Sequence, residues 1–167
     1  MLRRTVRARL AGVAAKNRPS MSKNPVKELA MSHIVTLNPP GRPEPQGFTH
    51  VAVATGSRMV FLAGQVATDE DGELVGPGDL AAQTEQALLN VHGCLAAAGA
   101  SFADVAKTTM YVVDWEESKL EQIVAGSIRA AERLGSPPPL VPVTLIPVPR
   151  LFAEGHLIEI DSTAVLA

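Results

Sequence analysis

The sequence predicts one α+β domain in which two helices cover one face of a mixed sheet, in the order β-β-α-β-α-β-β. Short runs rich in valine, isoleucine and threonine alternate with two longer stretches whose apolar residues recur at helical spacing. Glycine, proline and aspartate separate these segments, as turns and helix ends require. The chain has 167 residues, of which 46% are hydrophobic, and this balance suits one domain with a real core.

The first part of the chain, residues 1–37, differs from the rest. Eight basic residues fall within the first 27 positions, and no acidic residue precedes Glu28. Three interpretations stay open: a disordered basic tail, a start recorded upstream of the true one at Met21 or Met31, or a peptide that targets an organelle. We therefore place the domain at residues 38–167 and otherwise expect a cytoplasmic protein.

The body after the basic segment is acidic. It carries seven basic and seventeen acidic residues, a formal balance of −10. Nucleic-acid-binding proteins neutralise phosphates with basic patches, so this body is a poor candidate for RNA or DNA. The single cysteine, Cys94, excludes an intrachain disulfide, and no paired spacing of cysteine or histidine predicts a metal site. No run approaches the roughly 20 apolar residues of a membrane-spanning helix.

The domain is expected to open with strands. A segment rich in proline and glycine at 38–46 precedes two strand-like runs, His50–Ala54 and Met59–Ala63. The short turn Thr55-Gly56-Ser57 separates these runs, so together they predict a β-hairpin. A polar loop follows at 69–78.

Two amphipathic helices come next. Asp79 is placed to cap the first helix, and Gly99 to end it. Asp114, with Glu117 three residues later, forms a capping pattern for the second helix, which should end at Gly135. The apolar residues expected on the inner sides are Leu80, Ala87, Leu88, Val91, Leu95 and Ala98 in the first helix, and Leu120, Ile123, Val124, Ile128, Ala131 and Leu134 in the second.

The remaining strands are Val105–Val113, between the helices, and then Val143–Val148 and His156–Ala164. Three prolines in and around Val143–Val148 remove backbone donors, so this strand should be irregular or lie partly at a sheet edge. Both helices follow strands that we expect to pair side by side, which implies right-handed crossovers with both helices on one sheet face.

The other sheet face needs a cover. We expect Val143, Leu145 and Leu157 to make it partly apolar, and a monomer would expose this patch, so the pattern favours oligomerisation through the sheet. Glu159 alternates with two isoleucines that should face the helices, so its side chain points to the same uncovered face.

Four segments, in this order, closely resemble the RidA (YjgF) family. They are FLAGQV at 61–66, EQALLNV at 85–91, AGASFADVAKTT at 98–109 and LIEI at 157–160, and the match covers essentially the whole body. The resemblance implies a chorismate-mutase-like fold and a homotrimer that holds a small-molecule ligand in clefts between its subunits. It also implies hydrolysis of reactive imines or enamines, such as 2-iminobutanoate and 2-iminopropanoate, with no cofactor.

The family's site residues carry over only in part. The closing-strand glutamate, which the family is proposed to use with a water, matches Glu159, and the aromatic residue that opens the domain corresponds to Phe48. The arginine of the family's Pro-Ala-Arg-Ser motif, which holds the substrate carboxylate, falls at Val143, and an apolar side chain cannot replace a bidentate guanidinium. Arg150 could swing into the cleft instead, or be an ordinary solvated loop residue. The resemblance further places Gly64, Tyr111 and Leu145 in the cleft lining.

Several of these candidates also have a structural interpretation. Glu159 is either a general base or a hydrogen-bonding residue at the trimer interface. His50 and His156 could act as acid or base near neutral pH, although strand-end histidines are more often polar surface or interface groups. Cys94 lies among apolar helix residues and suits a small core position. Gly64 could let a ligand approach the backbone, or could simply be a bulge that ends its strand.

Three hypotheses about function follow. The first is a cofactor-independent deaminase of reactive imines or enamines, with a substrate range altered by the missing arginine. The second is a non-catalytic trimer that binds a metabolite or a protein partner. The third, RNA cleavage or translation inhibition, is the least compatible with the acidic body.

Overall fold

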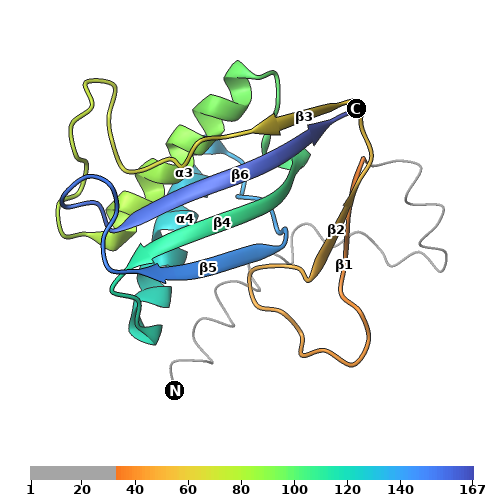
Figure 1. Cartoon of the computed structure of the whole chain (residues 1–167), viewed down its shortest axis with the longest axis horizontal. Coiled ribbons are helices and arrows are strands. Elements are labelled where there is room, and N and C mark those ends of the chain that lie inside the picture. Colours follow the sequence, from red (N-terminus) through yellow and green to blue (C-terminus); the bar gives the residue numbers. More distant parts are fainter. Residues whose placement is uncertain (1–32) are drawn as a thin grey trace.

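The computed structural model describes residues 33–167. Most of the predicted basic tail, residues 1–32, therefore lies outside the described part, and only residues 33–37 of it lie within. Two helices and six strands form the domain (Figure 1). The strands are β1 Ile34–Leu37, β2 Val51–Ala54, β3 Arg58–Phe61, β4 Val105–Val113, β5 Val143–Val148 and β6 Ile158–Leu166, and the helices are α3 Leu80–Ala97 and α4 Leu120–Leu134. Short 3-10 turns at Phe102–Asp104 and Glu117–Lys119 precede β4 and α4.

A mixed four-stranded sheet in the order β3-β6-β4-β5 is the centre of the fold. β5 runs parallel to β4, whereas β6 runs antiparallel to both β3 and β4. β5 lies at the edge, as its prolines predicted. The expectation that the strands on either side of each helix pair side by side holds for α4 but is wrong for α3, because β6 inserts between β3 and β4.

The predicted hairpin between the second and third strands is also wrong. β2 pairs with β1, a strand that the sequence did not suggest, over four residue pairs. β3 pairs instead with the end of β6. The connection between them crosses the end of β6, where a side chain on Gly56 would overlap the carbonyl of Leu166, and Ser57 N–H donates to that carbonyl at 3.0 Å. β2 and β3 thus each pair with another strand, and Thr55–Ser57 connect the ribbon to the main sheet.

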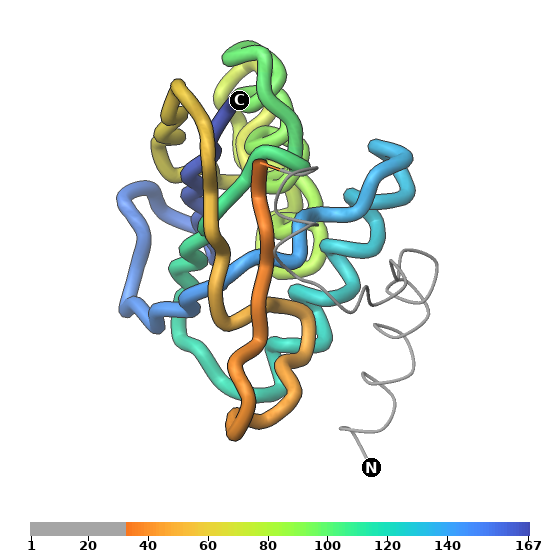
Figure 2. Tube along the Cα trace, turned by 90° about the vertical axis from the view of Figure 1, so that its right-hand side faces the viewer, coloured from red at the N-terminus to blue at the C-terminus, as the bar shows by residue number. Residues whose placement is uncertain are grey.

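The β1–β2 ribbon lies at one end of the sheet (Figures 1 and 2). Thr49 N–H, just before β2, donates to the carbonyl of Val141, just before β5, at 3.1 Å. Nε2 of His33, just before β1, lies 2.8 Å from Oδ1 of Asp104, so the ribbon contacts the chain just before both β4 and β5.

Both helices pack on one face of the sheet, as predicted (Figure 1). Asp79 caps α3 by accepting a hydrogen bond from Ala82 N–H at 3.0 Å, and Gly135 ends α4 with a left-handed φ of 63°. The helices approach closely at Gly126, where a side chain would overlap the carbonyl of Ala81. The buried core comprises Leu80, Ala87, Leu88, Val91, Leu95, Phe102, Val105, Val112, Ile123, Ala130, Val141, Ile158, Ile160 and Ala164.

The start of α4 differs from the expected capping pattern. Asp114 adopts a left-handed φ of 47° and ends β4, so it cannot cap a helix that begins at Leu120. The intervening residues form the 3-10 turn, and Lys119 Nζ donates to the carbonyls of Val113 at 3.1 Å and Asp114 at 2.8 Å. No helix in the described part of the chain is long and apolar enough to cross a membrane.

Candidate functional site

The carboxylate of Glu159 lies on the sheet face opposite the helices, which we call the open face. Its neighbours on β6, Ile158 and Ile160, are fully buried in the core beneath the helices. Glu159 itself is half-buried, as the alternation of side chains along a strand predicted.

Gly64 makes room for this carboxylate. A side chain at Gly64 would overlap Oε1 of Glu159, so the carboxylate occupies the space above the bare backbone of that glycine. The next residue, Gln65, fixes this arrangement through two backbone hydrogen bonds with Ile160, at 2.8 and 2.9 Å. The structure therefore brings Gly64 and Glu159, two of the candidate residues, into contact.

Two further side chains continue the line across the sheet. Tyr111 on β4 is the direct partner of Glu159 in the antiparallel pair, and Ile146 on β5 is the direct partner of Tyr111 in the parallel pair. Direct partners place their side chains on the same face, roughly 5 Å apart. We call Gly64, Glu159, Tyr111 and Ile146 the Glu159 row. It combines a carboxylate, a phenol and an apolar wall, which can orient a water molecule beside a small organic ligand.

Val143 and Leu145 lie on the other face, contrary to the sequence expectation. The register pairs Val143 with Thr108 and Leu145 with Met110, on the side of the sheet that carries the core. Leu145 packs against the core. A shift of one residue in a strand exchanges its faces, and the prolines around β5 gave no indication of which set faced outward. The residue of β5 that faces the carboxylate row is therefore Ile146.

Phe48 lies far from Glu159 within one chain. The backbone N–H of its neighbour Thr49 donates a hydrogen bond to the carbonyl of Val141, two residues before β5. Val141 and Ile146 of the Glu159 row are five positions apart, roughly 16 Å where the chain is extended. The ring of Phe48 packs edge-on against His50, at 5.5 Å between centroids. One chain alone does not bring Phe48 into the row.

Arg150 is exposed two residues after β5, towards the end of the sheet where β6 begins. It forms no hydrogen bond or ion pair with another residue of the described segment 33–167. The geometry therefore leaves both sequence interpretations open, a solvated arginine or a cation available to the row.

The two histidines do not join the row. His156 is buried, with 7% exposure, and its Nδ1 has no hydrogen-bond partner within residues 33–167. Gln83 holds the backbone on either side of His156, because its side-chain amide donates to the carbonyl of Gly155 at 2.9 Å and accepts from Leu157 N–H at 2.7 Å. His50 sits in the loop before β2, with Nε2 3.3 Å from the carbonyl of Pro43.

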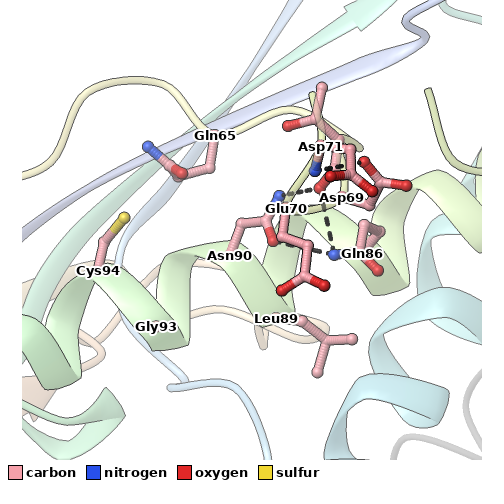
Figure 3. A pocket seen from close by; sticks show the side chains of 10 residues that line it. Gln65, Asp69, Glu70, Asp71, Gln86, Leu89, Asn90, Gly93 and Cys94 are labelled. Atoms are coloured by element: carbon pink, nitrogen blue, oxygen red, sulfur yellow. Dashed lines mark hydrogen bonds between the residues drawn. The ribbon is translucent and has the colours of Figure 1, made fainter. Parts of the chain in front are cut away.

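Cys94 lines an open groove between α3 and the loop at 65–71 (Figure 3). The side-chain amide of Asn90 donates to the carbonyls of Val66 and Thr68, both at 2.9 Å, and Gln86 donates to Asn90 Oδ1 at 2.9 Å. These amides hold the loop against the helix and are not free for a ligand. No group of three or more His, Cys, Asp or Glu residues in the described chain could hold a metal ion.

Sequence reasoning missed Lys107, a cation on the open face. It lies four residues before Tyr111 on β4, and its Nζ donates to Thr144 Oγ1 and, at 3.2 Å, to the carbonyl of Thr108. Burial lowers the pKa of Lys107, and the nearby carboxylate of Asp161 opposes this shift only in part. Counting back by twos from Tyr111 in the AKTTMY run would have placed Lys107 on this face.

Comparisons with known proteins agree with this architecture. The family model described as Endoribonuclease L-PSP matches residues 42–166. A RutC family protein of Pyrococcus horikoshii is 39% identical over 85 residues, which are 50% of this chain and 66% of that protein. A 2-iminobutanoate/2-iminopropanoate deaminase of Rattus norvegicus is 41% identical over 58 residues, 34% of this chain and 42% of that protein.

A solved structure shows the same fold. A Rid family protein from Yersinia pestis, described as of unknown function, superimposes with a TM-score of 0.70 at 36% identity, covering 80% of this chain and 99% of its own. The likeness confirms the predicted α+β class and the resemblance stated from sequence. The match with the Pyrococcus horikoshii relative spans just under two thirds of that protein, at 66%, and the match with a Pyrococcus abyssi relative spans 64%.

Proposed function

This chain belongs to the Endoribonuclease L-PSP family, the family of the RutC and Rid proteins, and we propose that it hydrolyses small reactive imines or enamines at the Glu159 row. The observation that carries the proposal is the carboxylate of Glu159 held over Gly64 on the open face, beside Tyr111. The deaminase activity in the name of the rat relative supports the reaction class, over the 34% of this chain that it matches.

The proposed chemistry needs only a water molecule and the side chains of the row. The Glu159 carboxylate accepts a proton as the oxygen of the water attacks the C=N carbon. A C–O bond forms, the C=N π electrons move to nitrogen, and Glu159 passes the proton taken from the water to that nitrogen, which gives a neutral carbinolamine. Glu159 then removes the hydroxyl proton of the carbinolamine and transfers it to the amino nitrogen as the C–N bond breaks, so that ammonia and a carbonyl compound are released and the carboxylate is restored. The phenol of Tyr111 is placed to donate a hydrogen bond to the developing oxygen or nitrogen centre.

We further propose that the preferred substrate is neutral near its reactive carbon. The row offers Ile146 where a cation would be needed to hold a carboxylate, and Val143, at the family's arginine position, faces the helices. An uncompensated substrate carboxylate beside Glu159 would add like-charge repulsion. An amide or ester analogue of an imino acid avoids both problems.

The homotrimer and its clefts between subunits belong to the same proposal. Phe61 and Met59 on β3 are 72% and 62% exposed, and their registers with Thr163 and Val165 place them on the open face. Apolar exposure on this scale next to the row supports a partner subunit that covers the face. Phe48, distant from Glu159 in its own chain, would then enter the row of a neighbouring subunit.

The test compares two substrates that differ only in charge. Ammonia release is measured from freshly generated 2-iminopropanamide and 2-iminopropanoate with the purified chain. We expect catalysed hydrolysis of the amide to exceed that of the acid, and Glu159→Gln to remove both. Saturable binding of the amide with no rate above the spontaneous one would favour the alternative, a non-catalytic binding protein.

A further inference from the structure

The side of α3 that faces away from the core, which we call its outer face, is almost without charge. Glu85 is the one charged residue of this 18-residue helix, and it is paired with Arg133 of α4 at 3.1 Å. The outer face is formed by small, apolar and amide side chains, namely Gln86, Leu89, Asn90, Gly93, Ala96 and Ala97. A helix that is apolar on all sides is normally buried, so α3 has the sequence of a helix that another segment covers.

Gly93 indicates that the covering segment comes close. It is exposed in the middle of α3, and a side chain there would meet no atom of residues 33–167 within 4 Å. Glycine inside a helix costs about 1 kcal/mol relative to alanine. Packing within the described chain does not require this glycine, whereas a second segment lying directly on the helix backbone would.

The outer face is also the floor of the groove that holds Cys94, and one wall of this groove is acidic (Figure 3). The groove has a volume of about 680 Å³, and its lining within the described chain includes no lysine, arginine or histidine. Asp69 accepts hydrogen bonds from the N–H groups of Asp71 and Glu73. The exposed carboxylates of Glu70 and Asp71 have no hydrogen bond or ion pair with residues 33–167. The groove thus combines an apolar floor with unpaired negative charge.

The start of the same chain has the complementary pattern. Its first 15 residues contain no acid, and four apolar residues recur at helical spacing between four arginines: Leu2, Val6, Leu10 and Val13, with Arg3, Arg4, Arg7 and Arg9. We propose that residues 2–14 of this chain bind in the groove beside α3, with their apolar side chains on the outer face and their arginines beside Glu70 and Asp71. This proposal does not rest on the deaminase activity, because Glu159 lies on the opposite side of the sheet.

The connection between this segment and the domain is long enough. The described chain begins at His33, whose Nε2 is 2.8 Å from Asp104 Oδ1, seven residues after the end of α3. The ring of Phe102, in the same turn as Asp104, lies 5.6 Å from the ring of His92, the neighbour of Gly93. The 18 residues between the segment and His33 can span roughly 60 Å, and a helix of this length is about 27 Å long. The segment can therefore reach the whole groove.

Cys94 is a built-in reporter, because it is the single thiol of the chain and lines the groove. A tethered segment has an effective concentration on the order of 1 mM, so a Kd of about 0.1 mM would cover the groove about ten times as often as it is open. The alkylation rate of Cys94 by N-ethylmaleimide, a neutral reagent, is measured by mass spectrometry on the full chain. We expect it to rise about tenfold in a variant that combines Arg3→Gln, Arg4→Gln, Arg7→Gln and Arg9→Gln.

Arg42→Gln is the control for this experiment, because Arg42 is an exposed arginine in the loop between β1 and β2. It should leave the alkylation rate at the wild-type value. Equal rates in the wild type and the four-arginine variant would overturn the proposal. If those equal rates increased on dilution, a second copy of the chain would be the occupant instead.

Limited digestion with trypsin tests the groove side of the contact. The initial rates of cleavage after Arg9, inside the segment, and after Lys23, in the connection, are compared within the same full chain. A variant with Glu70→Lys and Asp71→Lys should raise the ratio of these two rates about tenfold, because reversed charge in the groove wall repels the segment. Glu154→Lys, an exposed acid in the loop between β5 and β6, is the matched control and should leave the ratio unchanged. The same ratio in both variants, each with the circular dichroism spectrum of the wild type, would contradict the proposal.

Discussion

Replacing Gly64 by alanine should disable the Glu159 row while leaving the fold almost intact. The added methyl group would overlap Oε1, Cδ and Cγ of Glu159, all of which belong to a flexible side chain rather than to the backbone. The φ of Gly64 lies outside the left-handed region, so alanine meets no backbone strain there. The carboxylate must therefore rotate away, and the site loses its base without losing its sheet.

The expected magnitudes follow from this geometry. An off-rotamer glutamate costs about 0.5–1.5 kcal/mol, which bounds the loss of folding stability. The catalytic loss should be larger, because a misplacement of about 1 Å can lower the rate about 100-fold. That factor corresponds to nearly 3 kcal/mol of transition-state stabilisation.

The assay pairs ammonia release with urea denaturation, and Gly126→Ala is the matched control. A side chain at Gly126 would overlap the rigid backbone of Ala81 and the side chain of Thr84, so the two helices must separate. Overpacking of this kind costs about 1–3 kcal/mol of stability. The control lies away from the open face, so its folded fraction should keep the wild-type rate.

The reasoning would be refuted by a Gly64→Ala variant with wild-type kcat/KM. It would equally fail if the two variants lost activity only in proportion to their loss of folded protein. Either result would mean that the contact between Gly64 and Glu159 contributes to packing but not to catalysis.

Four further substitutions test other parts of the account. Ile146→Arg should raise the rate of hydrolysis of 2-iminopropanoate relative to that of its amide. Val143→Arg, on the helix side of the sheet, should instead lower the free energy of unfolding by about 1–3 kcal/mol without that gain in rate. The opposite pattern would show that the face assignment of β5 is wrong. Asp79→Ala removes the α3 cap and should cost about 1 kcal/mol in urea denaturation, and no change would mean that the bond to Ala82 is not formed in solution. Because the folded pKa of Lys107 is lowered, the unfolded chain holds more protons between that pKa and 10.5, so stability should rise with pH across this window. Lys107→Met should flatten that rise, and an unchanged slope would count against the shift.

Local signals in the sequence predicted much of the fold correctly. The strand Val105–Val113 has the expected bounds, Asp79 caps α3, and Gly135 ends α4. Each of these features depends on residues within a few positions of one another, so composition and spacing were sufficient.

Features that depend on distant parts of the chain were not predictable in this way. The pairing of β3 with β6 joins residues about a hundred positions apart, and nothing near Thr55–Ser57 indicates it. The outward face of β5 depends on its register with β4, so Val143 and Leu145 were assigned to the wrong side. The side-chain hydrogen bond of Lys107 and the shift of its pKa depend on Thr144 and Asp161, which lie on other strands.

The most direct test of the central claim is the rate of ammonia release from 2-iminopropanamide by the wild-type chain and by Glu159→Gln. We predict a rate above the spontaneous one for the wild type and a loss of about 100-fold or more in the variant, with the oligomeric state unchanged by size-exclusion chromatography. Equal rates in the two proteins, or a wild-type rate no higher than the spontaneous one, would contradict the assignment of Glu159 as the base.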